Sequence, residues 1–328
     1  MIKKLRYVFL MLAFIETLQA QEIHFSQISN NQFIINPANA GTCDGTLRIG
    51  ANYRSQGAAI SVPYKTFSAW AETHFEPQNL NRSTIGFGIS LLSDEAGDGG
   101  LITTAGYLTA SFIKGFNKDN TFKASLGFSV GLINRSIDFS RLVFDNQWNG
   151  TVFDPNVASG EPYIGNSIFS PDFNFGGSIF WEVNEDSKFN LGAALHHINR
   201  PKLTFYKSEN RVEQKLVLHA LAKQNIGENY QLIPGIYFAN QQGVNEILAG
   251  TNFLIIQNEM KFITGLWYRF ERDIIPHAGI MINGFIAEFS YDINVSKLHI
   301  ASNYRGGIEI SIVKTISVNN GRTKCYGF

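Results

Sequence analysis

The chain has 328 residues, and its 27 Lys plus Arg are balanced by 27 Asp plus Glu. It therefore lacks the basic excess that favours nucleic-acid binding. Charged residues are 16% of the sequence and aromatic residues 13%, whereas soluble domains average about 25% charged residues. Low charge with many aromatic residues is typical of a membrane β-barrel, in which alternate residues face lipid.

The first twenty residues predict an export signal. Three basic residues precede an apolar core at residues 7–15, and Leu18-Gln19-Ala20 fits a cleavage site. We therefore expect residues 1–20 to be a signal peptide that is removed before Gln21. Beyond this segment, no stretch approaches the roughly 18 apolar residues of a spanning helix.

Residues 21–45 differ from the rest of the chain because they show little alternation and are rich in Asn, Gln, Pro and Gly. Such a composition is typical of irregular structure. We expect an irregular lead-in segment that faces the periplasm or the lumen of a barrel.

From Thr46 onward the chain is a succession of strand patterns. The segment 120–134 shows the pattern well, because Phe122, Leu126 and Phe128 alternate with small or polar residues. Successive side chains of a strand point to opposite faces, so the apolar face is expected against lipid and the small face toward a lumen. The fourteen predicted strands are 46–55, 64–76, 82–93, 101–116, 120–134, 171–183, 187–199, 211–227, 229–240, 243–256, 259–271, 273–282, 284–294 and 303–315.

The connections between these strands alternate in length. The longer ones are 56–63, 94–100, 135–170, 200–210 and 295–302, and the shorter ones are 77–81, 117–119, 184–186, 228, 257–258 and 283; two others, 241–242 and 272, are short where the pattern expects a long loop. Outer-membrane barrels have short periplasmic turns and long outer loops. The sequence therefore predicts a 14-stranded antiparallel transmembrane outer-membrane β-barrel over residues 46–315, with long extracellular loops and short periplasmic turns. Residues 316–328 are then a periplasmic C-terminal tail.

The two cysteines are expected at the same rim of this barrel. Closure pairs the first strand with the last, which brings Cys43 and Cys325 to the periplasmic side of that seam. Export to an oxidising compartment permits a disulfide. We hypothesise a Cys43–Cys325 bond, and two unpaired thiols are the alternative.

The sequence offers no convincing catalytic, cofactor-binding or metal-binding residues. His196 and His197 are adjacent on a predicted strand, so they should point to opposite faces and not share a metal ion. Glu288, Asp292 and Glu309 alternate with aromatic or apolar residues; acid/base catalysis is one reading, and a polar lumen lining is the reading we favour. We therefore expect a protein that is not an enzyme.

Four short motifs stand out from the strand pattern. They are His24-Phe25-Ser26-Gln27, Asn36-Pro37-Ala38-Asn39-Ala40-Gly41, Asn52-Tyr53-Arg54-Ser55-Gln56 and Gly306-Gly307-Ile308-Glu309. Together they resemble the PorP/SprF family of outer-membrane proteins of the type IX secretion system, and the resemblance extends over the whole mature chain.

This resemblance implies a barrel in the outer membrane of a Bacteroidota-type bacterium. It implies a role in secretion and surface anchoring of a specific cargo, such as a gliding-motility adhesin with a type B C-terminal secretion domain. It also implies contacts with periplasmic and outer-membrane components of the secretion system. On this reading the longest outer loop is the candidate cargo-facing surface, through its aromatic residues Trp148, Phe153, Tyr163 and Phe169.

Two other functions remain open from the sequence. Fourteen strands can enclose a lumen, so an outer-membrane channel or hydrophobic-solute transporter is one alternative. An outer-membrane hydrolase is the other, although no nucleophile and base with a recognisable spacing occur.

Overall fold

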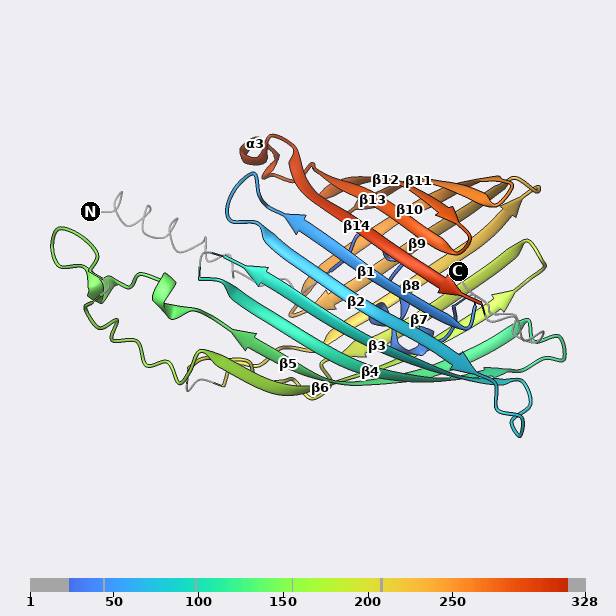
Figure 1. Cartoon of the computed structure of the whole chain (residues 1–328), viewed down its shortest axis with the longest axis horizontal. Helices are drawn as coiled ribbons and strands as arrows, with labels where there is room; N and C mark the ends of the chain where they lie inside the picture. Colours follow the sequence, from blue (N-terminus) through green and yellow to red (C-terminus); the bar gives the residue numbers. More distant parts are fainter. Residues whose placement is uncertain (1–23, 44, 98, 155, 207–208, 318–328) are drawn as a thin grey trace, which may run out of the picture.

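The structure is a computed structural model that describes residues 24–43, 45–97, 99–154, 156–206 and 209–317. Within these ranges, fourteen antiparallel strands close into one barrel, in which β1 pairs with both β2 and β14 (Figure 1). This confirms the predicted fold class and strand number. The strands are β1 Leu47–Gln56, β2 Tyr64–Phe75, β3 Ser83–Ala96, β4 Leu101–Gly115, β5 Phe122–Ser136, β6 Ser167–Glu182, β7 Ser187–His196, β8 Lys215–Ile226, β9 Tyr230–Gln241, β10 Val244–Gln257, β11 Met260–Arg269, β12 Asp273–Ile282, β13 Phe285–Asn294 and β14 Arg305–Ile316.

The starts of two strands differ most from the prediction. β6 begins at Ser167 rather than at 171, because it stays paired with β5 as far as Ser136. β8 begins at Lys215 rather than at 211, because Arg211 forms a separate bridge with Lys202. Backbone pairing with a neighbouring strand therefore sets these ends, and the hydrophobic pattern does not report it.

The alternation of β5 separates an apolar outer face from a small inner face. Leu126 and Leu132 are 60% and 61% exposed on the outside, whereas Ser125 and Ser129 are buried inside. An exposed apolar band around a closed barrel is the surface that lipid covers. Among the described residues, no helix is both long and apolar enough to span a bilayer.

The two ends of the barrel differ in their connections. One end, here the loop end, carries residues 137–166 with η2 Phe139–Arg141 and η3 Asp145–Gln147, residues 197–214, and residues 295–304 with α3 His299–Ser302. The opposite end, here the turn end, carries shorter connections such as 227–229 and 283–284 (Figure 1). The predicted sorting by length holds for most connections, and 242–243 and 270–272 are short at the loop end.

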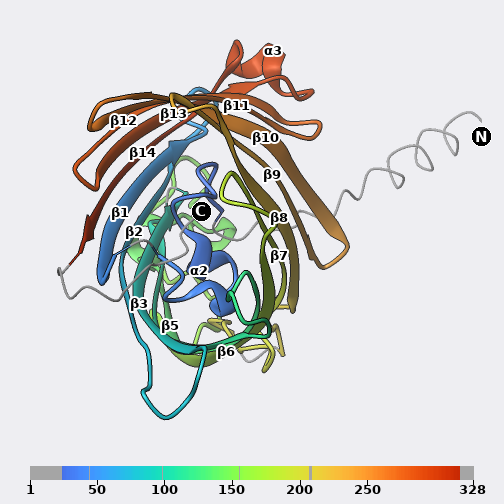
Figure 2. The ribbon, with the colours of Figure 1, turned by 90° about the vertical axis from the view of Figure 1, so that its right-hand side faces the viewer.

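Residues 24–43, here the plug, lie inside the barrel. Figure 2 shows the lumen from the turn end, with α2 Gln32–Ile35 across it; η1 Pro37–Asn39 follows. The plug contacts loop-end residues such as Arg54 through Ser26, and it reaches Glu72 near the turn end through Gly41. The lead-in segment therefore crosses much of the lumen before β1 begins.

We expect the apolar outer face to be required for membrane insertion. Val130 lies near the middle of β5 with its side chain outward, and Arg at the lipid-facing midplane of a barrel costs about 2–4 kcal/mol. Val130→Arg should lower the fraction that folds into vesicles, measured by heat-dependent gel mobility. Val143→Arg, at a 62% exposed loop position, should fold normally, and equal folding of both variants would contradict the assignment of the lipid face.

Candidate functional site

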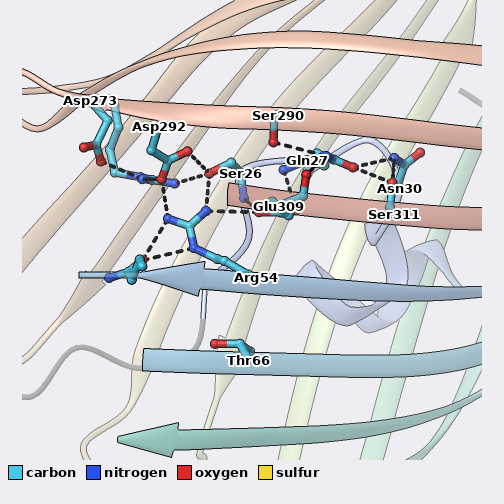
Figure 3. A network of polar contacts seen from close by, with 12 residues as sticks. Ser26, Gln27, Asn30, Arg54, Thr66, Asp273, Ser290, Asp292, Glu309 and Ser311 are labelled. Carbon is cyan, nitrogen blue, oxygen red and sulfur yellow. Dashed lines mark hydrogen bonds and ion pairs between the residues drawn. The ribbon is translucent and has the colours of Figure 1, made fainter. Parts of the chain in front are cut away.

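The plug is joined to the wall at the loop end by a buried cluster of charges (Figure 3). Arg54 of β1 forms ion pairs with Asp292 at 2.5 Å and Glu309 at 3.0 Å. Arg269 of β11 pairs with Asp292 at 3.0 Å and Asp273 at 2.8 Å, and also with Glu246 at 3.1 Å. We call these residues and Ser26 the Ser26 cluster.

Ser26 completes this cluster from the plug side. Its backbone N–H donates to Glu309 Oε2 at 2.7 Å, and its hydroxyl donates to Asp292 Oδ1 at 3.0 Å. The same hydroxyl oxygen accepts from Arg269 at 2.8 Å and from Arg54. Buried carboxylates and guanidinium groups require such paired hydrogen bonds to offset their desolvation. The plug therefore supplies hydrogen bonds to the buried charges of the wall.

Polar contacts continue from Ser26 along β13 and β14. The side chain of Gln27 donates to Ser290 Oγ at 3.1 Å and to the Glu309 carbonyl at 3.2 Å. Asn30 Nδ2 donates to Ser311 Oγ at 2.8 Å (Figure 3). The same nitrogen donates to Glu288 Oε2 at 2.9 Å. The inward carboxylates of β13 and β14 thus hold the plug, which agrees with a polar lumen lining.

On the opposite wall, the Asn36-Pro37-Ala38 motif is held through backbone groups. The Asn36 side chain caps η1 by accepting from the Ala38 N–H at 3.0 Å, and it donates to the Gly177 carbonyl at 3.0 Å. The Ala38 carbonyl accepts from Ser125 Oγ at 2.7 Å. Wall hydroxyls therefore pair backbone groups that have no sheet partner.

Wall glycines provide the space for this close contact. An added Cβ at Gly127 would lie 2.2 Å from the Pro37 carbonyl carbon, and one at Gly176 would lie 2.0 Å from Asn36 Oδ1. At Gly86 it would lie 2.0 Å from the Ala40 carbonyl oxygen. Gly131 differs, because its nearest neighbour is the Tyr107 ring. The small lumen face predicted for strand 120–134 thus accommodates the plug through Gly127.

The family-motif residues of β1 and β14 lie at the seam between these two strands. Asn52 is buried and accepts from Trp70 Nε1 at 3.3 Å, and Gln56 accepts from Arg54 Nε at 3.0 Å. Gly307 is the register partner of Gln56. Tyr53, by contrast, points outward and is 39% exposed. Residues that are more than 250 positions apart in the chain, such as Arg54 and Glu309, therefore meet in one cluster.

Sequence reasoning did not identify Arg269, Asp273 or Glu246 as members of this cluster. Arg269 directly follows the outward Tyr268 in β11, so its side chain points inward. A charged residue at an inward position of a predicted strand was therefore the signal that could have identified it. Its partners are distant in the chain or across a turn, and the strand pattern does not specify them.

The candidate cargo-facing residues do not form one surface. Trp148 and Phe153 contact each other with ring centroids 5.0 Å apart, and they are 50% and 49% exposed. Tyr163 stacks on Phe139 at 4.0 Å. The prediction that Phe169 lies in the loop is wrong, because Phe169 belongs to β6 and is 72% exposed on its outer face. Trp148 and Phe153 remain as an exposed aromatic pair of segment 137–166.

The base of this loop is connected to the plug through residues 203–205. The Ile164 N–H donates to the Phe205 carbonyl at 2.8 Å. Leu203 is buried and belongs to a cluster in which Phe25 and Ile34 of the plug also pack. Nearby, the hydroxyl and backbone N–H of Ser140 both donate to Asp138 and lower the pKa of that exposed carboxyl. The loop base is thus ordered by local contacts, and it connects to the plug.

The prediction that His196 and His197 point to opposite faces is wrong. β7 ends at His196, and His197 has a φ of 56° that turns its side chain away from the strand pattern. His196 Nε2 lies 2.9 Å from the Ile35 carbonyl of the plug, and His197 Nδ1 lies 2.9 Å from Asp172. Both rings therefore contact interior groups. In the described part of the chain, no group of three or more His, Cys, Asp or Glu residues could hold a metal ion.

The predicted disulfide partners differ in what the structure describes. Cys43 is buried near the start of β1. Cys325 lies outside the described residues, as do the predicted signal peptide and most of the C-terminal tail. The Cys43–Cys325 bond therefore stays a prediction.

A closed barrel with an apolar outer belt and its own N-terminal segment in the lumen defines an integral membrane protein of the outer-membrane β-barrel class. Residues 17–313 match the family model of the type IX secretion system membrane protein PorP/SprF, and the chain belongs to this family. Family and fold together point to the outer membrane and to components of that secretion system as partners. A comparison with curated proteins gives no match.

Solved structures share the fold at very low sequence identity. The Ralstonia pickettii toluene transporter TbuX is 9% identical with a TM-score of 0.52, covering 90% of this chain and 96% of that one. A TodX monoaromatic hydrocarbon channel mutant is 8% identical with a TM-score of 0.54, covering 86% and 92%. The CymD monoaromatic hydrocarbon channel is 10% identical with a TM-score of 0.51, covering 90% and 95%. These similarities concern the fold alone.

Loss of Arg54 should destabilise the whole barrel. Arg54→Met leaves Asp292 and Glu309 buried without one of their cations, and breaking a buried ion pair costs about 3–5 kcal/mol. Unfolding in urea, followed by tryptophan fluorescence, measures the change. Arg200→Met removes the exposed ion pair with Glu213 and should cost about 0–1 kcal/mol; equal effects would contradict the structural role of the Ser26 cluster.

Adjacent glycines of β6 provide a matched test of plug packing. Gly176→Ala places a Cβ against Asn36, whereas Gly177→Ala places it 3.5 Å from Leu126 on the outer face, which is ordinary contact. With Cys325 replaced by Ser, Gly176→Ala should speed maleimide labelling of the buried Cys43 severalfold, because the plug is displaced. Gly177→Ala should leave the rate unchanged, and equal rates in the two variants would argue against tight plug packing at Gly176.

Proposed function

We propose that this chain is a cargo-specific partner in type IX secretion, needed to secrete and anchor one surface protein and without enzymatic activity. A gliding-motility adhesin with a type B C-terminal domain is the cargo class that the family implies. One observation carries the proposal: the plug is integrated into the wall through the Ser26 cluster and the wall glycines. A lumen filled in this way favours a membrane tether over a conduit.

The two ends of the barrel then have different partners. Long loops of outer-membrane barrels face the cell exterior, so cargo would meet the loop end after export of the chain by its signal peptide. Trp148 and Phe153 form an exposed aromatic pair there, and aromatic residues often dominate binding energy at protein interfaces. Periplasmic secretion components would contact the turn end and the tail at 316–328.

A channel or hydrophobic-solute transporter is the alternative function. Its support is the fold shared with the toluene transporters and hydrocarbon channels, and the plug contacts argue against free passage. Planar-bilayer conductance discriminates the two: silent barrels support the tether, whereas stable conductance of the unmodified protein would favour the channel.

Replacing the exposed aromatic pair should impair cargo display. Trp148→Ala with Phe153→Ala removes two candidate anchors, and truncation of an interface hot spot costs about 2 kcal/mol or more. Surface display of one cargo, measured by antibody labelling of intact cells, should fall at least about tenfold, while heat-dependent gel mobility of the barrel stays unchanged. Val143→Ala, at another exposed position of the same loop, should display cargo normally; normal display by the aromatic double variant would refute this surface.

A further inference from the structure

The connection between β13 and β14, residues 295–304, lies outside the barrel wall. In Figure 2, α3 lies beyond the outline of the strands, next to β11–β13, and Figure 1 places it at the loop end of the same wall. Segment 137–166 instead continues past the rim along the long axis (Figure 1). Residues 295–304 therefore overhang the side of the barrel that lipid surrounds.

This segment exposes large apolar side chains. Ile300 is 82% exposed, Leu298 is 59% exposed and Tyr304 is 53% exposed. Contiguous exposed apolar groups mark protein or membrane contact sites. Three such residues in one short connection make it a candidate contact site.

The backbone of the segment is held by its own polar groups. Asn294 Oδ1 accepts from the Ser296 N–H at 2.9 Å, and Ser296 Oγ accepts from the Leu298 N–H at 3.1 Å. The His299 and Tyr304 rings lie 5.0 Å apart. These contacts hold the conformation in which Leu298 and Ile300 remain exposed.

The surroundings match a membrane surface. The outward face of β14 continues from this segment with Ile308, Ile310 and Ile312, which belong to the apolar belt. Lys297 and Arg305 are exposed, and residues 295–308 contain no Asp or Glu. Basic residues beside exposed apolar residues are typical of an interfacial segment at an anionic lipid surface.

We propose that residues 295–304 form a lipid-binding foot on the outer leaflet. Leu298 and Ile300 enter the boundary between headgroups and acyl chains, and Lys297 and Arg305 bind phosphate groups of anionic lipids. The foot fixes the tilt and rotation of the barrel, because interfacial anchors on one side restrict both. The inference rests on the proposed orientation of the loop end toward the exterior.

Fluorescence in lipid nanodiscs tests the proposal on the full mature chain. With Cys43 and Cys325 replaced by Ser, Ile300→Cys is labelled with the fluorophore NBD in phosphatidylcholine nanodiscs. Its emission should shift to the blue and be quenched by brominated acyl chains. Val152→Cys, 56% exposed in segment 137–166, should stay water-like, and a label at 300 that is equally water-like would overturn the proposal, as expected if a protein covers the patch instead.

The headgroup contact is tested in the same system. Adding phosphatidylglycerol should increase the blue shift at position 300, and Lys297→Glu with Arg305→Glu should abolish that increase. An increase that persists in the charge variant would overturn the phosphate contact. Leu298→Cys serves as the label site if Ile300→Cys folds poorly, judged by heat-dependent gel mobility. No cargo is present in these nanodiscs, so a negative result for the foot does not bear on the proposed cargo role. Loss of cargo display in cells likewise does not bear on the proposed lipid contact.

Discussion

The structure depends on mutual neutralisation of charges buried between plug and wall. Arg54 and Arg269 share Asp292, and Ser26 donates to Asp292 and Glu309 while it accepts from both arginines. Each of these groups would be costly to bury alone, because desolvation of a charge exceeds what one contact returns. Ser26 of the plug adds hydrogen bonds that these wall charges would otherwise lack, and the wall charges in turn hold Ser26 in place. This interdependence links β1, β11, β13 and β14 across the seam of the barrel.

Because the plug occupies the lumen, the loop end is the surface that the proposed cargo recognition would use. Segment 137–166 is ordered at its base by stacking of Tyr163 on Phe139 and by the bond from Ile164 to Phe205, while Trp148 and Phe153 stay exposed. Leu203 then packs in one cluster with Phe25 of the plug. A partner bound at this loop would thus contact a segment that is linked to the plug through residues 203–205. The apolar belt and the proposed foot would orient the barrel in the membrane.

The site could be predicted only in part. The motifs contained Ser26, Arg54 and Glu309, and the small face of strand 120–134 was predicted to point toward a lumen. Arg269 was missed because nothing local distinguishes an inward arginine with buried partners from one in a water-filled lumen. Phe169 was misplaced because pairing with β5 extends β6 beyond its alternating pattern. His197 was misplaced because its left-handed backbone ends the strand alternation.

The sequence by itself determined the barrel. Alternation of side chains and loop lengths follows from the geometry of a sheet between lipid and lumen, so both can be read locally along the chain. The tertiary structure alone decided that residues 24–43 lie in the lumen and which wall residues bind them. It also decided that Trp148 contacts Phe153 while Tyr163 stacks on Phe139. The plug contacts depend on residues far apart in the chain, which closure of the barrel brings together and no local pattern encodes.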